Sequence, residues 1–316
     1  MGDPAHFSVK GGANPHTRTR WGTRRGVDRE RAIGQWHNLR GALEDLGIRV
    51  VVVPAVADWP GSVYPANAGY LVDVDVPSPP SAKRFYLANL LPSRAGEKDH
   101  YRKVLSESGF APVEIDDRYR MEGEADFFPA GGVHLMTYGG LERQRFVPSL
   151  GFPPWKRVYG FRTDARVEPI LQQAIGERRI LRIELTLEAH YHGDTVLCAF
   201  GPGRRFLLGY REGIAVEGWK QLEHEFGDAL IELSREDAQR YAANSFTFTQ
   251  EGDSVLVMPD GLSSRLLDQV SERGVTPIPV DVSEFLKKGG GSVKCMIGDL
   301  GVVSSPTYRS NLSQFG

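Results

Sequence analysis

Three short segments of the chain carry residues that can do covalent chemistry together. Near the C-terminus, a glycine run at 289–291 precedes Cys295, one of only two cysteines. Far upstream stand an acidic cluster at 122–126 and a histidine cluster at 190–194. A cysteine thiolate is a nucleophile, a histidine can transfer protons, and paired carboxylates can hold a cation. These are the parts needed to attack the carbon of a guanidinium group.

The two cysteines stand in different settings. A lone cysteine is more often a small buried hydrophobe than a nucleophile. Glycine permits close backbone approach and unusual dihedral angles, so the glycine run favours a functional site at Cys295. We expect this run to lead into a short strand that ends on Cys295. Cys198 lies in the apolar stretch 196–200 without such neighbours, and we interpret it as structural.

The histidine cluster allows two interpretations. His192 stands two residues before Asp194, which fits a general acid/base beside a carboxylate that binds substrate. Alternatively, His190, His192 and Asp194 alternate like metal ligands on one face of a strand. A metal hydrolase needs further ligands, and the chain offers only scattered candidates such as His134 and His224. We therefore predict a site without a metal.

The acidic cluster places Glu122, Glu124 and Asp126 at alternate positions. On a strand, all three side chains would face the same way. Such a row is either a solvated edge or a receiver for a cation. A guanidinium suits a receiver, because it is always charged and presents a planar fork of donors to paired carboxylates.

Composition describes an ordinary globular chain. Of its 316 residues, 25% are charged, and the formal net charge of −2 gives no general attraction to nucleic acid or membrane. Six arginines between positions 18 and 31 are interrupted by acidic residues and lack an aromatic stacking pattern, so a solvated basic segment is favoured over a nucleic-acid patch. No apolar run approaches a membrane span, and no secretory signal is visible. With two cysteines and no disulfide scaffold, we expect the reducing cytoplasm.

Helical and extended patterns alternate along the chain, which predicts the α/β fold class. Helices are expected between the N-cap Asp28 and Gly47, at 101–109, from Ser234 onward and at 262–274. Strands are expected at 48–53, 180–187, 195–200, 253–258 and 276–282. No dinucleotide or phosphate-loop fingerprint accompanies these helices. Because no linker divides the chain, we predict one domain, 1–316, with a long loop or lid at 137–158.

Taken in order, the motifs resemble the guanidine-modifying, or pentein, superfamily. The closest resemblance is to its arginine dihydrolase and dimethylargininase-like branch, which is related to the amidinotransferases. The motifs run nearly the whole chain: segment 1–9 with Asn14-Pro15, loop 66–69, Arg94 with Glu97, the acidic cluster, Gly160-Phe161-Arg162-Thr163-Asp164, segment 191–195 and segment 283–295. Two departures concern substrate access. The branch usually continues Asn-Pro with Trp-Met, whereas this chain has His16-Thr17 and also carries the insertion 137–158.

The resemblance implies a fold and a set of roles. The fold is a single domain of five ββαβ modules, arranged as a propeller around a central polar pocket. Cys295 would be the nucleophile and His192 the general acid/base, with Glu122 in the catalytic set. The resemblance places the remaining residues around the substrate: Asp126 and Asp194 at the guanidinium, Asn67 and Asn14 along the pocket, and Arg94 and Arg162 at the substrate carboxylate.

The expected activity is cysteine-dependent hydrolysis of a guanidino substrate, L-arginine or a derivative, through a covalent amidino-thioether intermediate. Loss of ammonia from arginine gives citrulline, and a second round on the ureido group gives ornithine, ammonia and carbon dioxide. Loss of an alkylamine from a methylated substrate is the dimethylargininase outcome. The alternative function is transfer of the amidino group to an amine. A cysteine amidase or a metal-dependent amidase is a less favoured third hypothesis. A non-catalytic binding relative would lack the cysteine that this chain keeps. We expect a small-molecule substrate, no cofactor, and no nucleic-acid or membrane partner; association into a homo-oligomer stays open.

Overall fold

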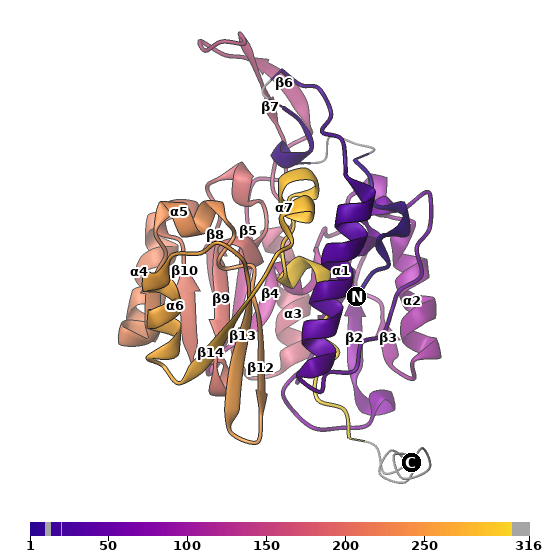
Figure 1. Ribbon diagram of the computed structural model, residues 1–316, viewed down its shortest axis with the longest axis vertical. Coiled ribbons are helices and arrows are strands. Elements are labelled where there is room, and N and C mark those ends of the chain that lie inside the picture. Colours follow the sequence, from indigo (N-terminus) through magenta and orange to yellow (C-terminus); the bar gives the residue numbers. More distant parts are fainter. Residues whose placement is uncertain (10–13, 20, 305–316) are drawn as a thin grey trace.

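A ββαβ unit recurs four times in the computed structural model, which describes residues 1–9, 14–19 and 21–304 (Figure 1). Each unit contributes one sheet of three strands. The first two strands of every unit pair antiparallel, and the second and third pair in parallel. A helix connects the two parallel strands, since a parallel pair needs a crossover. This repeat confirms the predicted α/β class.

The bounds of the four units follow the chain. The first unit contains β1 (Gly69–Leu71), β2 (Arg84–Leu87), α2 (Glu97–Glu107) and β3 (Ala111–Val113). The second contains β4 (Phe127–Ala130), β5 (Val133–Tyr138), α3 (Glu168–Ile175) and β8 (Arg179–Glu184). The third contains β9 (Leu197–Phe200), β10 (Phe206–Gly209), α4 (Val216–Phe226) and β11 (Leu230–Glu232). The fourth contains β12 (Phe246–Gln250), β13 (Asp253–Pro259), α6 (Ser264–Ser271) and β14 (Val275–Val280).

The N-terminal region supplies a further helix and a parallel bridge. Helix α1 (Arg29–Asp45) begins where the predicted N-cap Asp28 accepts a hydrogen bond from the Arg31 N–H, and it ends before Gly47. Gly2 and Val53 form a parallel bridge on either side of this helix. The predicted strand 48–53 is wrong apart from that bridge, because residues 48–52 are only half-buried or exposed and lie along the cluster that α1 buries.

The insertion is more regular than the predicted loop. Within it, β6 (Arg145–Pro148) and β7 (Trp155–Val158) pair antiparallel as a hairpin. Figure 1 shows this hairpin standing out from the rest of the molecule, at the end where α7 (Ser283–Gly289) lies. The short helix α5 (Arg235–Gln239) begins at the predicted N-cap Ser234.

The segment before Cys295 is not the expected strand. Helix α7 ends at Gly289, and Gly290 adopts a left-handed conformation with φ of +76° that terminates the helix. Lys294–Met296 then form a single 3-10 turn. The side chain of Asn244 fixes this turn, because its Oδ1 accepts hydrogen bonds from the N–H groups of Ser292 and Cys295, both at 3.0 Å. The glycine run therefore ends a helix and opens a tight turn.

Candidate active site

Cys295 is held in its turn by two polar side chains. Its Sγ lies 3.2 Å from the Asn244 Nδ2 donor and 3.3 Å from Asp194 Oδ2, to which the thiol donates. Gly291 is required beside it, because a Cβ at that position would lie 2.5 Å from the Tyr64 ring and 3.0 Å from the Cβ of Cys295. The thiol is only 3% exposed. The turn thus presents a buried sulfur against a carboxylate.

Burial controls the charge of this thiol. Removal from water raises the pKa of Cys295 well above its ordinary value, and the negative charge of Asp194 raises it further. The hydrogen bonds of the Ser292 backbone and the Asn244 side chain with Cys295 lower its pKa, but they do not overcome this rise. The raised pKa therefore favours the neutral thiol in this site.

His192 forms a buried ion pair with Glu122. Its Nε2 lies 2.8 Å from Glu122 Oε2. Burial alone would raise the pKa of Glu122, but the His192 hydrogen bond and charge outweigh it and lower the pKa to about 2. Burial likewise opposes the charged imidazole, yet Asp126 and Glu122 raise the pKa of His192 above its ordinary value. The pair is an imidazolium and a carboxylate.

The acidic cluster does not form the predicted strand. Residues Gly123–Ala125 make a 3-10 turn. Gly123 has φ of +65°, and a Cβ there would lie 2.5 Å from the Gly69 carbonyl oxygen, so only glycine fits. The turn sends the three carboxylates apart: Glu122 meets His192, and Glu124 pairs with Lys294 at 2.8 Å. The expectation that all three face the same way is wrong.

Asp126 anchors the histidine loop from inside the protein. Its Oδ1 accepts hydrogen bonds from Thr137 Oγ1 at 2.7 Å and the Gly193 N–H at 2.9 Å. Its Oδ2 accepts one from Thr163 Oγ1 at 2.7 Å. Burial raises the pKa of Asp126, while the charge of His192 and these hydrogen bonds oppose the rise. Both oxygens already have protein donors, and they hold the backbone next to His192.

Asp194 differs from Asp126 because one of its oxygens is unpaired. Oδ2 accepts from Cys295, but Oδ1 is buried with no hydrogen-bond partner among the residues that the structure describes. Burial raises the pKa of Asp194 to about 6, against the opposing charges of His192 and Lys294. Buried acceptors are normally satisfied, and an orphan carboxylate oxygen marks a place for a ligand donor.

The structure connects Asn67 and Arg94 to the same network. Asn67 Nδ2 lies 3.5 Å from His192 Nε2, and Asn67 Oδ1 accepts from Arg94 Nη1 at 3.0 Å. Glu97 grips the other side of the Arg94 guanidinium with contacts of 2.9 and 2.7 Å, and Gly61 accepts a further hydrogen bond. The Arg94 guanidinium therefore donates to Asn67, Glu97 and Gly61 within the protein.

Asn14 and Arg162 lie at the edges of the network. Asn14 Nδ2 donates to the Gly289 carbonyl at 2.9 Å, which ties the N-terminal loop to the end of α7. Arg162 is 2% exposed, and its guanidinium lies over the Tyr191 ring with Cζ 4.7 Å from the centroid. Tyr191 in turn lies against His192, with ring centroids 4.6 Å apart. All nine predicted residues thus lie in or beside one connected region.

Comparisons with known proteins agree on one family. A family model for eukaryotic N,N dimethylarginine dimethylhydrolase matches residues 195–302. The N(G),N(G)-dimethylarginine dimethylaminohydrolase of Mycobacterium tuberculosis is 29% identical over 297 residues, covering 93% of this chain and 83% of that protein. An uncharacterized protein of Caenorhabditis elegans is 25% identical over 94% of this chain and 91% of its own. The chain is thus similar along most of its length to a dimethylarginine dimethylaminohydrolase, in agreement with the guanidine-modifying resemblance of its motifs.

Solved structures of two kinds of enzyme share the fold of this chain. The N-terminal domain of ArgZ, covalently bonded to a reaction intermediate, superposes with a TM-score of 0.78 at 22% identity, covering 96% of this chain and 97% of that one. The same domain has been solved bound to product and is described as a cyanobacterial arginine dihydrolase. A dimethylarginine dimethylaminohydrolase adduct with S-methyl-L-thiocitrulline gives a TM-score of 0.64 at 20% identity, with coverages of 93% and 96%.

The residues of the alternative metal interpretation do not share the face of a strand. No group of three or more histidine, cysteine or carboxylate side chains arranged to hold a metal occurs in the described ranges 1–9, 14–19 and 21–304. His190 lies in a 3-10 turn, not on a strand with His192, and its Nδ1 lies 3.3 Å from Thr195 Oγ1. Burial lowers the pKa of His190 to about 4. Within the same ranges, no helix is long and apolar enough to cross a membrane.

Sequence reasoning missed the residues that hold the motifs in place. Asn244 contacts Cys295 twice and donates to the Asp194 carbonyl at 3.1 Å. Thr137 and Thr163 fix Asp126. A buried asparagine just after α5 carries no motif of its own, and its single signal is a polar side chain directly after two alanines. Contacts between residues more than 30 positions apart are invisible until the fold is known.

Proposed function

We propose that this protein hydrolyses the guanidino group of L-arginine or an arginine derivative through a covalent intermediate on Cys295. The observation that carries the proposal is the position of Asp194, which contacts Cys295 Sγ with one oxygen and leaves the other buried and unpaired. A guanidinium N–H donated to Oδ1 would satisfy that oxygen. The same contact would bring the guanidinium carbon next to the sulfur, as a near-attack geometry requires.

The electrostatics of the site support activation by the substrate itself. The buried thiol of Cys295 is neutral in the empty site, and a bound guanidinium would supply the cation that favours its thiolate, with the thiol proton released to solvent. Asp194 would hold the guanidinium in one orientation and balance its charge. The reaction therefore begins only when a cationic substrate occupies the site.

His192 would then complete both halves of the reaction. The Cys295 thiolate attacks the guanidinium carbon, and the imidazolium of His192 gives its proton to the departing amine. Neutral His192 takes a proton from water, which attacks the amidino-thioether and releases the sulfur. Glu122 keeps the imidazole oriented and stabilises its charged form. Asn67, held by Arg94, would line the guanidinium side of the pocket.

The remaining predicted roles are carried forward as parts of this proposal. Asn14 would line the pocket through its link to Gly289. Arg162 and Arg94 would meet the substrate carboxylate, and Arg94 would have to exchange a protein acceptor to do so. Asp126 would act on the guanidinium from a distance, since both of its oxygens already accept hydrogen bonds from the protein.

We also propose that the chain is a single catalytic domain with the five-module propeller of its superfamily. Four ββαβ units support this arrangement. The parallel bridge between Gly2 and Val53 across α1 has the strand–helix–strand order of the second half of a fifth unit. Such a ring would gather the Cys295, His192 and Glu122 segments at its centre.

The activities named for the relatives limit the choice of substrate. They include dimethylarginine dimethylaminohydrolase and arginine dihydrolase. Incubation with arginine, dimethylarginine and agmatine, followed by mass spectrometry of the products, tests the proposal. Citrulline or ornithine from arginine, or release of an alkylamine from the methylated substrate, would support hydrolysis. Product formation only in the presence of an added amine acceptor would show amidino transfer, and no conversion of any guanidino compound would refute the proposed function.

A further inference from the structure

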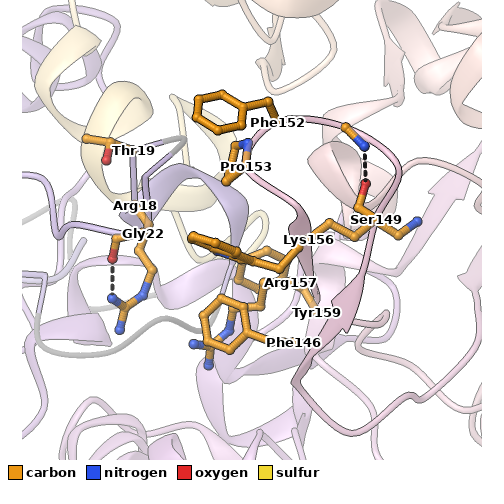
Figure 2. Close-up of a pocket in the computed structure, with 12 residues that line it drawn as sticks. Arg18, Thr19, Gly22, Phe146, Ser149, Phe152, Pro153, Lys156, Arg157 and Tyr159 are labelled. Atoms are coloured by element: carbon orange, nitrogen blue, oxygen red, sulfur yellow. Dashed lines mark hydrogen bonds between the residues drawn. The ribbon is translucent and has the colours of Figure 1, made fainter.

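A cavity of about 350 Å³ lies between the β6–β7 hairpin and the N-terminal loop (Figure 2). Its lining is aromatic and cationic, and includes Phe146, Phe152, Trp155, Arg18, Lys156 and Arg157. Trp21 of the N-terminal loop packs edge-on against Phe152 of the hairpin, with ring centroids 5.3 Å apart. The two segments therefore meet across the cavity.

The charged residues that line this cavity are all cationic. Of the twelve lining residues, three are cationic and none is acidic. The Arg157 guanidinium lies over the Phe146 and Tyr159 rings, with Cζ 5.3 and 5.6 Å from their centroids. Burial raises the pKa of Tyr159, and the charges of Arg157 and Arg18 oppose the rise, so both cations act on this ring. Aromatic packing thus fixes a cation in the wall.

Two guanidinium nitrogen atoms of the lining residues have no hydrogen-bond acceptor among the described residues. The Nε atoms of Arg18 and Arg157 are buried and have no hydrogen-bond partner among the described residues. Arg18 otherwise donates to the Gly22 carbonyl at 2.6 Å, and Arg157 to Gln144 at 3.4 Å. A buried N–H without an acceptor is costly, and a carboxylate would satisfy two guanidinium donors at once.

The two walls of the cavity continue into the Cys295 site. Asn14 lies four residues before Arg18 and bonds the Gly289 carbonyl, while a Cβ on Gly290 would lie 2.8 Å from the His16 ring. On the other wall, Tyr159 precedes Gly160, whose carbonyl accepts from Arg162. Both walls of the cavity therefore run directly along the chain into segments of the Cys295 site.

We propose that this cavity binds an arginine derivative that is extended beyond its α-carbon by an apolar group ending in a carboxylate. The proposal rests on the proposed hydrolysis of guanidino compounds. The aromatic side chains pack the apolar group, and Arg18 and Arg157 hold its carboxylate. The dipeptide arginyl-phenylalanine carries these parts in this order, whereas free arginine leaves the cavity unfilled. The insertion therefore selects the substrate by its non-reacting end.

The test compares kcat/KM for arginine, arginyl-phenylalanine and arginyl-phenylalanine amide. The dipeptide should exceed both arginine and the amide by at least about tenfold, since the amide lacks the carboxylate that two cations hold. Arg157→Gln and Arg18→Gln should each reduce the preference of the dipeptide over its amide toward one. Arg145→Gln is the matched control, because Arg145 lies on the same hairpin, pairs with Glu142 and does not line the cavity. It should keep the preference of the parent.

Calorimetric binding of the same compounds separates the two proposals. If arginine is hydrolysed and the dipeptide binds and reacts no better than its amide, the cavity proposal is overturned and the proposed function stands. If no guanidino compound is hydrolysed, the proposed function falls, and titration of the unreacted dipeptide against its amide still decides the cavity. Equal binding of dipeptide and amide by the parent overturns the proposal in either case. Tighter dipeptide binding that Arg157→Gln and Arg18→Gln abolish supports it.

Discussion

The two cysteines of this chain are equally buried and chemically opposite. Cys295 is 3% exposed and Cys198 is 6% exposed, and burial raises the pKa of both thiols. Cys198 Sγ lies near backbone carbonyls, at 3.5 Å from Ser245 and 3.9 Å from Ala199, within strand β9. Cys295 Sγ contacts the side chains of Asp194 and Asn244 on a 3-10 turn.

Burial and the direction of the pKa shift therefore do not separate the two thiols, and the proposed nucleophile Cys295 is distinguished from Cys198 by the groups that contact its sulfur. Cys198 is packed in an apolar cluster, and its Sγ hydrogen bonds go to backbone carbonyls, so the charges of Arg204, Lys294 and Asp194 act on it only without direct contact. Cys295 has a carboxylate with an unpaired oxygen beside it, so a cation can enter and change its protonation. Each prediction below removes one part of that difference.

Removing the sulfur of each cysteine should give the largest contrast. Cys295→Ala should reduce kcat by at least about 10⁴-fold, because the covalent step is lost. Cys198→Ala should keep kcat within about threefold of the parent while lowering thermal stability, since it leaves a small cavity in the core. Steady-state assays and thermal melts of both variants check this. Comparable activity in the two variants would remove the distinction.

Neutralising the carboxylate beside Cys295 should have the next largest effect. Asp194→Asn leaves the shape of the site but removes the charge that faces the guanidinium. Removing one partner of a desolvated charge pair costs about 2–5 kcal/mol. We therefore expect kcat/KM to fall by about 30-fold to several thousand-fold. A loss below about threefold would mean that another group holds the cation.

Asn244 supports Cys295 through the backbone and the sulfur, and its loss should have a smaller effect. Asn244→Ala leaves the buried N–H groups of Ser292 and Cys295 without their acceptor, which costs about 1–3 kcal/mol. We expect a fall in kcat of about 5-fold to 150-fold. Ser245→Ala, which removes a hydroxyl bonded to the Ala242 carbonyl on the Cys198 side, is the control and should change kcat by less than threefold. Equal losses would indicate a general folding defect.

Acid should weaken the site through Asp194. Its pKa is raised to about 6, so the carboxylate becomes protonated and loses its charge as the pH falls through that value. The plot of kcat/KM against pH, which reports the free enzyme, should therefore fall below about pH 6. The raised pKa of His192 keeps its imidazole protonated to a higher pH than that of an ordinary histidine. The alkaline fall of the profile should therefore start at a correspondingly higher pH.

A matched variant assigns the acid limb. Burial also raises the pKa of Glu124, to about 7, and Glu124 pairs with Lys294 in the cavity that Asp194 borders. Glu124→Gln removes that second titration and should leave the limb near pH 6 in place. A limb that disappears in Glu124→Gln would assign the acid dependence to Glu124.

The sequence predicted which residues of the candidate site lie together better than it predicted their local backbone. Composition and periodicity predicted the α/β class, helix α1 with its cap at Asp28 and strand β13. The grouping of Cys295 and His192 with carboxylates in one site was implied by the resemblance of the ordered motifs. The strand expected before Cys295 and the strand through the acidic cluster are 3-10 turns instead. Glycines at left-handed positions, Gly290 and Gly123, make these turns, and the partners that require them come from distant segments.

The insertion shows the same limit. Its irregular composition predicted a loop at 137–158, whereas β6 and β7 pair as a hairpin. Arg18, which lines the cavity, and Trp21, which packs against the hairpin, lie more than 120 positions before it in the sequence. Both belong to the basic segment that was interpreted as solvated. Periodicity within a segment cannot reveal a cavity that two distant segments form together.

Trapping the intermediate tests the central claim most directly. The enzyme is mixed with arginine or dimethylarginine, quenched in acid during turnover, digested and examined by peptide mass spectrometry. We predict that the peptide containing Cys295 gains the mass of the substrate-derived amidino group, and that the peptide containing Cys198 keeps its mass in the same digest. Product formation with an unmodified Cys295 peptide throughout turnover, or an adduct on Cys198, would contradict the account.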